Sequence, residues 1–195
     1  MTSPEWNVED GFGLMAEENI HALGQLVDFL DDLEEAHLYG QAFGARSQHS
    51  IGKHVRHIID HYLTFLTAVG EHKVLDYEDR QRDETLETDR QAAHQCLNRI
   101  VRSFSDNSVQ PSRGAPLAMQ HNSGGHYQTV LTSMERELAF LASHTVHHMA
   151  IIGMLAEQAG LQVDADFGVN PSTLRHWARK ADKYEVKREA VACNN

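Results

Sequence analysis

Residues 131–160 read LTSMERELAFLASHTVHHMAIIGMLAEQAG, and this stretch decides the fold class of the 195-residue chain. Apolar residues recur through it at alternating intervals of three and four positions, which is the period of one face of an α-helix. Thr132 followed by Glu135 matches a capping box at the start, and Gly160 is a natural end. The stretch therefore predicts one long amphipathic helix with a buried side.

Three further stretches have the same helical period, at about residues 16–36, 51–69 and 84–105. Ser50 is the expected N-cap of the second helix, and a short final helix is expected from Pro171, because proline is favoured in the first turn. Two long connections, residues 71–83 and 106–129, separate the helices. Four helices of about 20 residues joined in this way predict an all-α fold, a four-helix bundle with long crossover connections, as a single domain over residues 1–195.

The second long connection contains a pattern of its own. Residues 117–120 and 126–130 flank the sequence Asn-Ser-Gly-Gly at 122–125, which predicts a small β-hairpin.

The composition of the chain argues against a nucleic-acid-binding protein and against a membrane protein. The chain has 17 Lys and Arg against 28 Asp and Glu, a net charge of −11, so it lacks the basic surface that nucleic acid or anionic lipid requires. No apolar run approaches the roughly 20 residues that span a bilayer, and the first residues do not resemble a secretory signal. Cys96 and Cys193 suggest no disulfide framework, and Cys96 is expected as a small core residue. We expect a cytoplasmic protein.

Histidine is unusually frequent, with 14 residues. His144 and His148 are four positions apart on the longest predicted helix, so their imidazoles lie on one face and can share a metal ion. His147 is turned about 100° from His148 and cannot easily join them. The alternative explanation for such a pair is two histidines that form hydrogen bonds in or beside the core.

A third ligand is expected from the second helix, which offers His54, His57 and His61. The centre of its apolar stripe lies closer to His54 and His61 than to His57, so the residues alone leave the choice open and favour the first two. Asp60 lies about one turn after His57. It is a candidate acceptor for a ligand imidazole, and pairing with Arg56 is an equally good explanation.

The chain resembles the DinB superfamily of metal-binding four-helix proteins over about residues 33–176. The resemblance rests on three motifs, which are Ser50-Ile51-Gly52 leading to His57-Ile58-Ile59-Asp60, Ser143-His144-Thr145-Val146-His147-His148, and Phe167-Gly168-Val169-Asn170-Pro171-Ser172-Thr173. It implies His57, His144 and His148 as the metal ligands. We follow it here and keep His61 and His54 as the alternatives that the helical period favours.

The resemblance also implies a function. The DinB superfamily includes bacillithiol transferases and mycothiol-dependent isomerases. The resemblance therefore implies one divalent metal ion (zinc, nickel or iron) that activates a thiol or water. A small-molecule substrate, a low-molecular-weight thiol and a homodimer are expected with it, and Leu63 lies off the main apolar stripe. A metal-dependent hydrolase and a non-catalytic metal-binding stress or interaction protein are the alternatives. No catalytic residue is assigned.

Residues 76–83 are rich in both charges. Arg80 or Arg82 is a candidate to hold a substrate carboxylate at the mouth of the site, and an exposed charged segment is the competing explanation.

Overall fold

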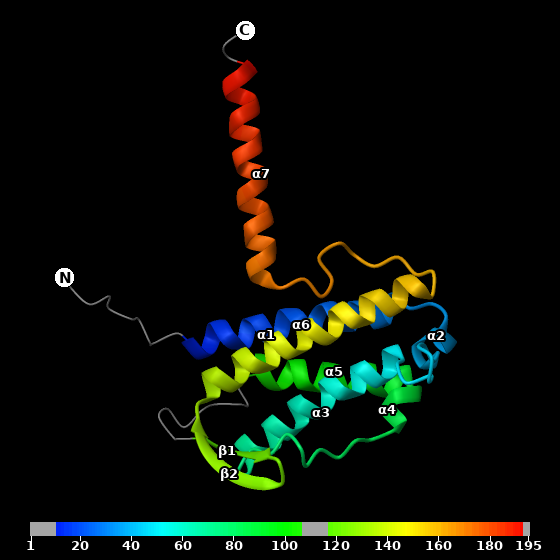
Figure 1. Cartoon of the computed structure of the whole chain (residues 1–195), viewed down its shortest axis with the longest axis vertical. Coiled ribbons are helices and arrows are strands. Elements are labelled where there is room, and N and C mark those ends of the chain that lie inside the picture. Colours follow the sequence, from blue (N-terminus) through cyan, green and yellow to red (C-terminus); the bar gives the residue numbers. More distant parts are fainter. Residues whose placement is uncertain (1–10, 107–116, 193–195) are drawn as a thin grey trace, which may run out of the picture.

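Four long helices pack together in the computed structural model, which describes residues 11–106 and 117–192 (Figure 1). They are α1 (Gly11–Asp32), α3 (Ile51–Gly70), α5 (Arg90–Ser105) and α6 (Met134–Gln158). Helices α1 and α3 each contact both α5 and α6. The expectation of a helical fold is confirmed, and Cys193 lies outside the described residues.

The sides of the helices that face one another form the core. Each of the four contributes fully buried apolar side chains, among them Leu23, Leu26, Ile58, Phe65, Leu97, Leu138 and Ile152. Removing one such side chain from water contributes about 1.5–3 kcal/mol to folding. Cys96 belongs to this core, as expected, and its burial raises the pKa of its thiol.

Two helix boundaries differ from the prediction because polar groups end the helices early. The first helix stops at Asp32 instead of Ala36, and the Arg90 guanidinium donates hydrogen bonds to the carbonyl groups of Leu30 and Leu33. A separate short helix, α2 (Ala36–Gly40), follows. The expected third helix is divided into α4 (Thr85–Thr88) and α5 at Asp89. Its backbone is extended and its side chain accepts a hydrogen bond from the Ala92 amide.

The start of α6 also differs from the predicted capping box. Ser133 is the N-cap and accepts a hydrogen bond from the Arg136 amide, whereas the Thr132 hydroxyl donates to Glu137 at 2.6 Å. The predicted stop is confirmed, because Gly160 adopts a left-handed φ of 85° just after the helix.

Helix α6 is long and apolar enough, by length and composition alone, to cross a membrane, which the sequence analysis did not foresee. The same features are found in core helices of globular proteins. Leu138, Leu141 and Ile152 of α6 are completely buried, and the helix packs on α1 and α3.

The predicted hairpin is confirmed and is longer than expected. Strands β1 (Leu117–Ser123) and β2 (His126–Thr132) pair antiparallel around Gly124 and Gly125, whose positive φ angles suit a two-residue turn. Leu75 forms two backbone hydrogen bonds with β1, so the connection after α3 is attached to the hairpin. The final helix, α7 (Pro171–Ala192), begins where predicted but has 22 residues instead of a short span, and it extends away from the packed helices (Figure 1).

Two glycines of the sequence motifs allow close approach between segments. A Cβ atom on Gly52 would lie 2.0 Å from the Glu87 carbonyl oxygen, so Gly52 lets α4 lie against α3. Gly168 has a φ of 67°, and a Cβ atom there would lie 2.5 Å from the Ala150 amide nitrogen. Both glycines therefore bring neighbouring segments onto the two helices that carry the candidate histidines.

Replacing Gly52 by alanine is expected to lower the free energy of unfolding by about 1–3 kcal/mol, the usual cost of overpacking. Gly24→Ala in α1 is the matched control, because nothing lies within 4 Å of its would-be Cβ atom. Gly24→Ala should leave stability unchanged or raise it by up to about 1 kcal/mol. Chemical denaturation measures both changes, and equal stabilisation by the two substitutions would contradict the proposed packing role of Gly52.

Candidate metal centre

Five histidines meet between α3 and α6, and they include every candidate from the sequence analysis. His54, His57 and His61 come from α3, while His144 and His148 come from α6. Spacings of three and four residues place each set on one side of its helix. The ring centroids of His57 and His148 are 4.4 Å apart, and those of His61 and His144 are 4.2 Å apart.

The shortest contacts between the two helices join ring nitrogens. His57 Nε2 lies 3.0 Å from His144 Nε2, and His54 Nδ1 lies 2.9 Å from His148 Nδ1. Two nitrogens that each bind a tetrahedral zinc ion at about 2.0–2.1 Å are about 3.3 Å apart. The His57–His144 pair therefore already has a separation close to that of two ligands of one metal ion.

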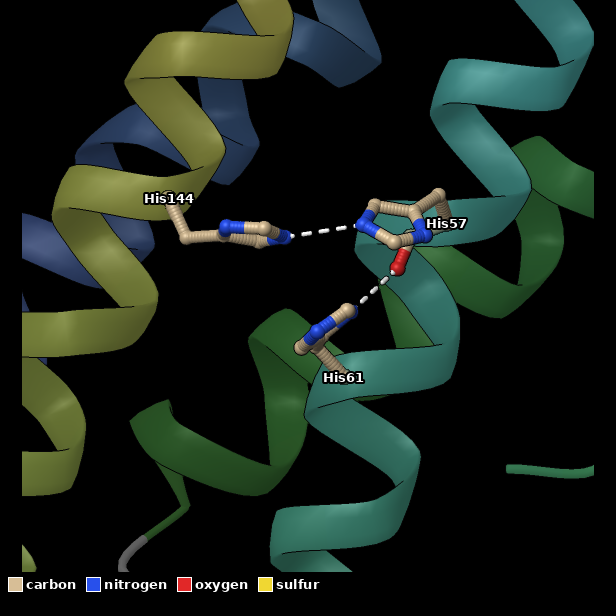
Figure 2. A group of neighbouring side chains, drawn as sticks. All are labelled: His57, His61 and His144. Atoms are coloured by element: carbon tan, nitrogen blue, oxygen red, sulfur yellow. Dashed lines mark hydrogen bonds between the residues drawn. The ribbon is translucent and has the colours of Figure 1, made fainter. Parts of the chain in front are cut away.

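His57, His61 and His144 form the group whose ligand atoms all lie within 4.8 Å of one another, among the residues that the structure describes (Figure 2). The His61 Nδ1–H group donates a hydrogen bond to the His57 carbonyl oxygen at 2.8 Å. This bond fixes the tautomer and makes the Nε2 atom of His61 an acceptor. That lone pair faces the Arg80 Nη1 atom at 3.5 Å in this structure, and it is the one that could bind a metal ion.

His148, the third ligand implied by the resemblance, lies beside this group with its ring 4.5 Å from that of His144. Its Nδ1 is directed at His54 in this structure. Two sets of three ligands are therefore possible. One is His57, His61 and His144, and the other is His57, His144 and His148. Helical period cannot choose between them, because it specifies a face of the helix while side-chain rotamers decide which nitrogens converge.

The histidine cluster is held in its neutral form. Burial is the main cause that lowers the pKa of His57 to about 2, of His148 to about 3 and of His54 and His61 to about 4. The neighbouring histidines lower these pKa values further, whereas the hydrogen bond to the His57 carbonyl group acts to raise the pKa of His61. The pKa of His144 is lowered as well, again mainly by burial. Neutral imidazole is the form that binds metal ions, so the protein supplies the required protonation state in advance.

Neither His147 nor Asp60 joins the histidine cluster. His147 is exposed, as expected from its angle on the helix. Asp60 is buried and pairs with Arg56 at 2.6 Å, and Arg56 also binds Glu87 at 2.9 Å. The pairing explanation for Asp60 is therefore the one that the structure supports.

Three residues near the cluster were missed in the sequence analysis. Tyr77 stacks on His61 with the ring centroids 5.2 Å apart, and Phe140 stacks on His144 at 5.3 Å. The Tyr77 hydroxyl donates to Glu137, a completely buried carboxylate, at 3.0 Å. The one available signal was that Tyr77 is the single aromatic residue in the polar stretch 71–83.

Of the two candidate arginines, one contacts the histidine cluster and the other does not. Arg80 reaches the cluster, with its Nη1 atom 3.5 Å from His61 Nε2, whereas Arg82 is exposed and donates to the Glu78 carbonyl group.

Comparisons with known proteins agree with the motifs. The sequence profile described as "DinB family" matches residues 7–178. A curated protein of Rhizopus delemar, named FK506-binding protein 5, is 35% identical over 106 residues. That match covers 53% of this chain and 27% of the Rhizopus protein, so the chain spans about a quarter of that relative's length. No solved structure gives a significant match.

The lowered pKa values predict a pH-dependent stability of the metal-free protein. Below the unfolded histidine pKa of about 6.5, the unfolded chain binds protons that the folded cluster does not accept until about pH 4. The free energy of unfolding should therefore be largest above about pH 6.5 and fall as the pH decreases toward 4. Denaturation in the presence of a chelator measures this slope. His148→Gln should reduce the slope, and an unchanged slope in this variant would contradict the prediction.

Proposed function

Because the chain belongs to the DinB family and brings five histidines together between α3 and α6, we propose that it binds one divalent metal ion through His57 and His144. The observation that carries this proposal is the 3.0 Å separation of their Nε2 atoms, with a third imidazole close enough to complete the set. The geometry favours His61 as the third ligand, and the resemblance favours His148.

The donor set fits such an ion. The cluster consists of neutral imidazoles, and the buried Nε2 atom of His54 has no hydrogen-bond partner among the described residues. All-imidazole sites suit zinc, nickel and iron, so the proposal includes these three metals.

We propose further that the site is that of a metal-dependent enzyme of the thiol transferase or isomerase type. A metal ion with three protein ligands supplies a nucleophile at neutral pH, because it lowers the pKa of a bound thiol or water. The protein's own part is to hold the imidazoles neutral and to limit water. Tyr77 and Phe140 stack on His61 and His144, and His57, His144 and His148 stay half-buried, whereas His61 is buried.

Metal binding is tested by single substitutions in protein purified without a histidine tag. Elemental analysis should find about one divalent ion per wild-type chain, and His57→Ala and His144→Ala should each weaken binding by more than about 100-fold, since even indirect ligand partners contribute 10–100-fold. His147→Ala is the control and should bind as the wild type does. Full retention of metal in His57→Ala would contradict the proposed site.

The third ligand is decided by the same assay. Loss of metal in His61→Ala with retention in His148→Ala would support the geometric set, and the opposite result would support the set implied by the resemblance.

Activity is tested with a thiol panel and a chlorinated electrophile such as monochlorobimane. In the expected reaction the thiolate sulfur forms a C–S bond, chloride leaves, and the thiol proton passes to solvent. Turnover should require metal and should be lost in His144→Ala. Turnover of an activated ester in place of thiol transfer would favour the hydrolase. Tight metal binding without either activity would favour a non-catalytic metal-binding protein.

The homodimer is a separate prediction, which light scattering at micromolar concentration checks through the molecular mass. A monomer mass would contradict it. The cytoplasmic location and the exclusion of nucleic-acid and membrane partners also remain predictions from the sequence.

A further inference from the structure

Arg80 is held against the histidine cluster by the connection that follows α3. Its Nη1 atom donates a hydrogen bond to the Tyr77 carbonyl oxygen and lies 3.5 Å from Nε2 of His61. Tyr77 itself is anchored, because its ring stacks on His61 and its hydroxyl group donates to Glu137. The guanidinium therefore lies beside the nitrogen that His61 presents for a ligand.

This cation lacks a partner of opposite charge in the part of the chain that the structure describes. The Arg80 Nε atom is buried and makes no hydrogen bond, and no carboxylate forms an ion pair with the side chain. Arg56 is the contrast, because it binds both Asp60 and Glu87. The pKa of Arg80 is lowered, mainly by burial and next by the charge of Arg82. A half-buried cation without an ion-pair partner is available to a ligand that supplies the opposite charge.

The Asp60 and Glu78 carboxylates act on Arg80 through their charge, but neither forms an ion pair with it among the described residues. The Asp60 carboxylate acts on Arg80 only at longer range, because it is bound by Arg56 at 2.6 Å.

We propose that Arg80 anchors an anionic oxygen group, a carboxylate or a phosphate, on the small molecule that binds beside the histidines. This inference rests on the proposed function, and it assigns the substrate or the thiol to the anionic class. The planar guanidinium forms paired hydrogen bonds with such groups, and its buried Nε–H is available for one of them. A metal ion at the histidines would add positive charge beside Arg80, so both favour the same anionic ligand.

Arg80 has a competing structural role, since its bond to the Tyr77 carbonyl group also secures the connection. A structural role predicts equal effects on charged and uncharged ligands, whereas an anchor discriminates between them. The test therefore compares two ligands that differ in charge alone.

The zinc-loaded full chain is titrated with 3-mercaptopropionate and with its neutral amide, 3-mercaptopropionamide, by calorimetry. The wild type should bind the carboxylate about tenfold to a hundredfold more tightly than the amide, the range expected for hydrogen bonds to a charged group. Arg80→Gln should lose this preference while its affinity for the amide stays unchanged. Arg82→Gln is the matched control, because Arg82 is exposed on the same connection, and it should keep the preference.

Inorganic phosphate is the second probe. Competition with 3-mercaptopropionate in wild type and not in Arg80→Gln would support an anchor for both kinds of anion, and absence of competition would support a carboxylate anchor. An equal preference in wild type and Arg80→Gln, or no preference in wild type, would overturn the proposal. If Arg80→Gln does not fold, Arg80→Lys replaces it, and it should show a reduced preference for 3-mercaptopropionate over the amide. The comparison of the two ligands in the wild type still tests the proposal.

Metal content is measured in the same samples, so the two proposals fail separately. Normal zinc binding without a charge preference would overturn the anchor alone. A charge preference that depends on Arg80 in a protein that binds no zinc would overturn the metal site alone.

Discussion

A buried chain of hydrogen bonds through Asn19, Tyr62 and Thr145 joins α1, α3 and α6, and the histidine cluster depends on it. The Tyr62 hydroxyl donates to the Asn19 side-chain oxygen at 2.6 Å and accepts from the Thr145 hydroxyl at 3.1 Å. The Asn19 amide group then donates to the carbonyl oxygens of Met15 and Leu138. All three polar side chains are essentially inaccessible to water, and each unsatisfied group would cost about 1–3 kcal/mol. The bond between Tyr62 and Thr145 holds α3 at one position along α6, and sliding either helix would break it.

That position determines which histidines meet. Tyr62 directly follows His61, and Thr145 directly follows His144, so the bond between Tyr62 and Thr145 places these two histidines at the same level of the helix pair. The neighbouring turns then bring His57 to His144 and His54 to His148. Burial of the cluster holds the imidazoles neutral, and Arg80 is the cation at its edge. Neutral imidazoles beside a guanidinium that forms no ion pair among the described residues are the basis for the proposed metal ion and anionic ligand.

Much of this arrangement was predictable from the sequence, because its signals are periodic. The helical period between residues 131 and 160 specified α6 and the shared face of His144 and His148, and the Asn-Ser-Gly-Gly sequence specified the hairpin turn. Gly52 stands in a motif that carries the resemblance, but only the structure shows that it lies against the Glu87 carbonyl oxygen. Helix ends were less predictable, because Arg90 ends α1 through contacts from a distant segment and Ser133 replaces Thr132 as the N-cap of α6.

The sequence by itself determined the fold class, the faces that carry the histidines and the membership of the DinB family. Only the tertiary structure determined how the histidine-bearing faces of α3 and α6 are aligned with each other. A helical period specifies a direction around an axis but not the distance between nitrogens on two helices. It therefore could not show that His61, which was kept only as an alternative ligand, lies in one group with His57 and His144. The sequence offered Arg80 and Arg82 as two candidates at the mouth of the site, and only the structure separates them, because an irregular connection has no period and its path follows from contacts with the hairpin, Tyr77 and Glu137.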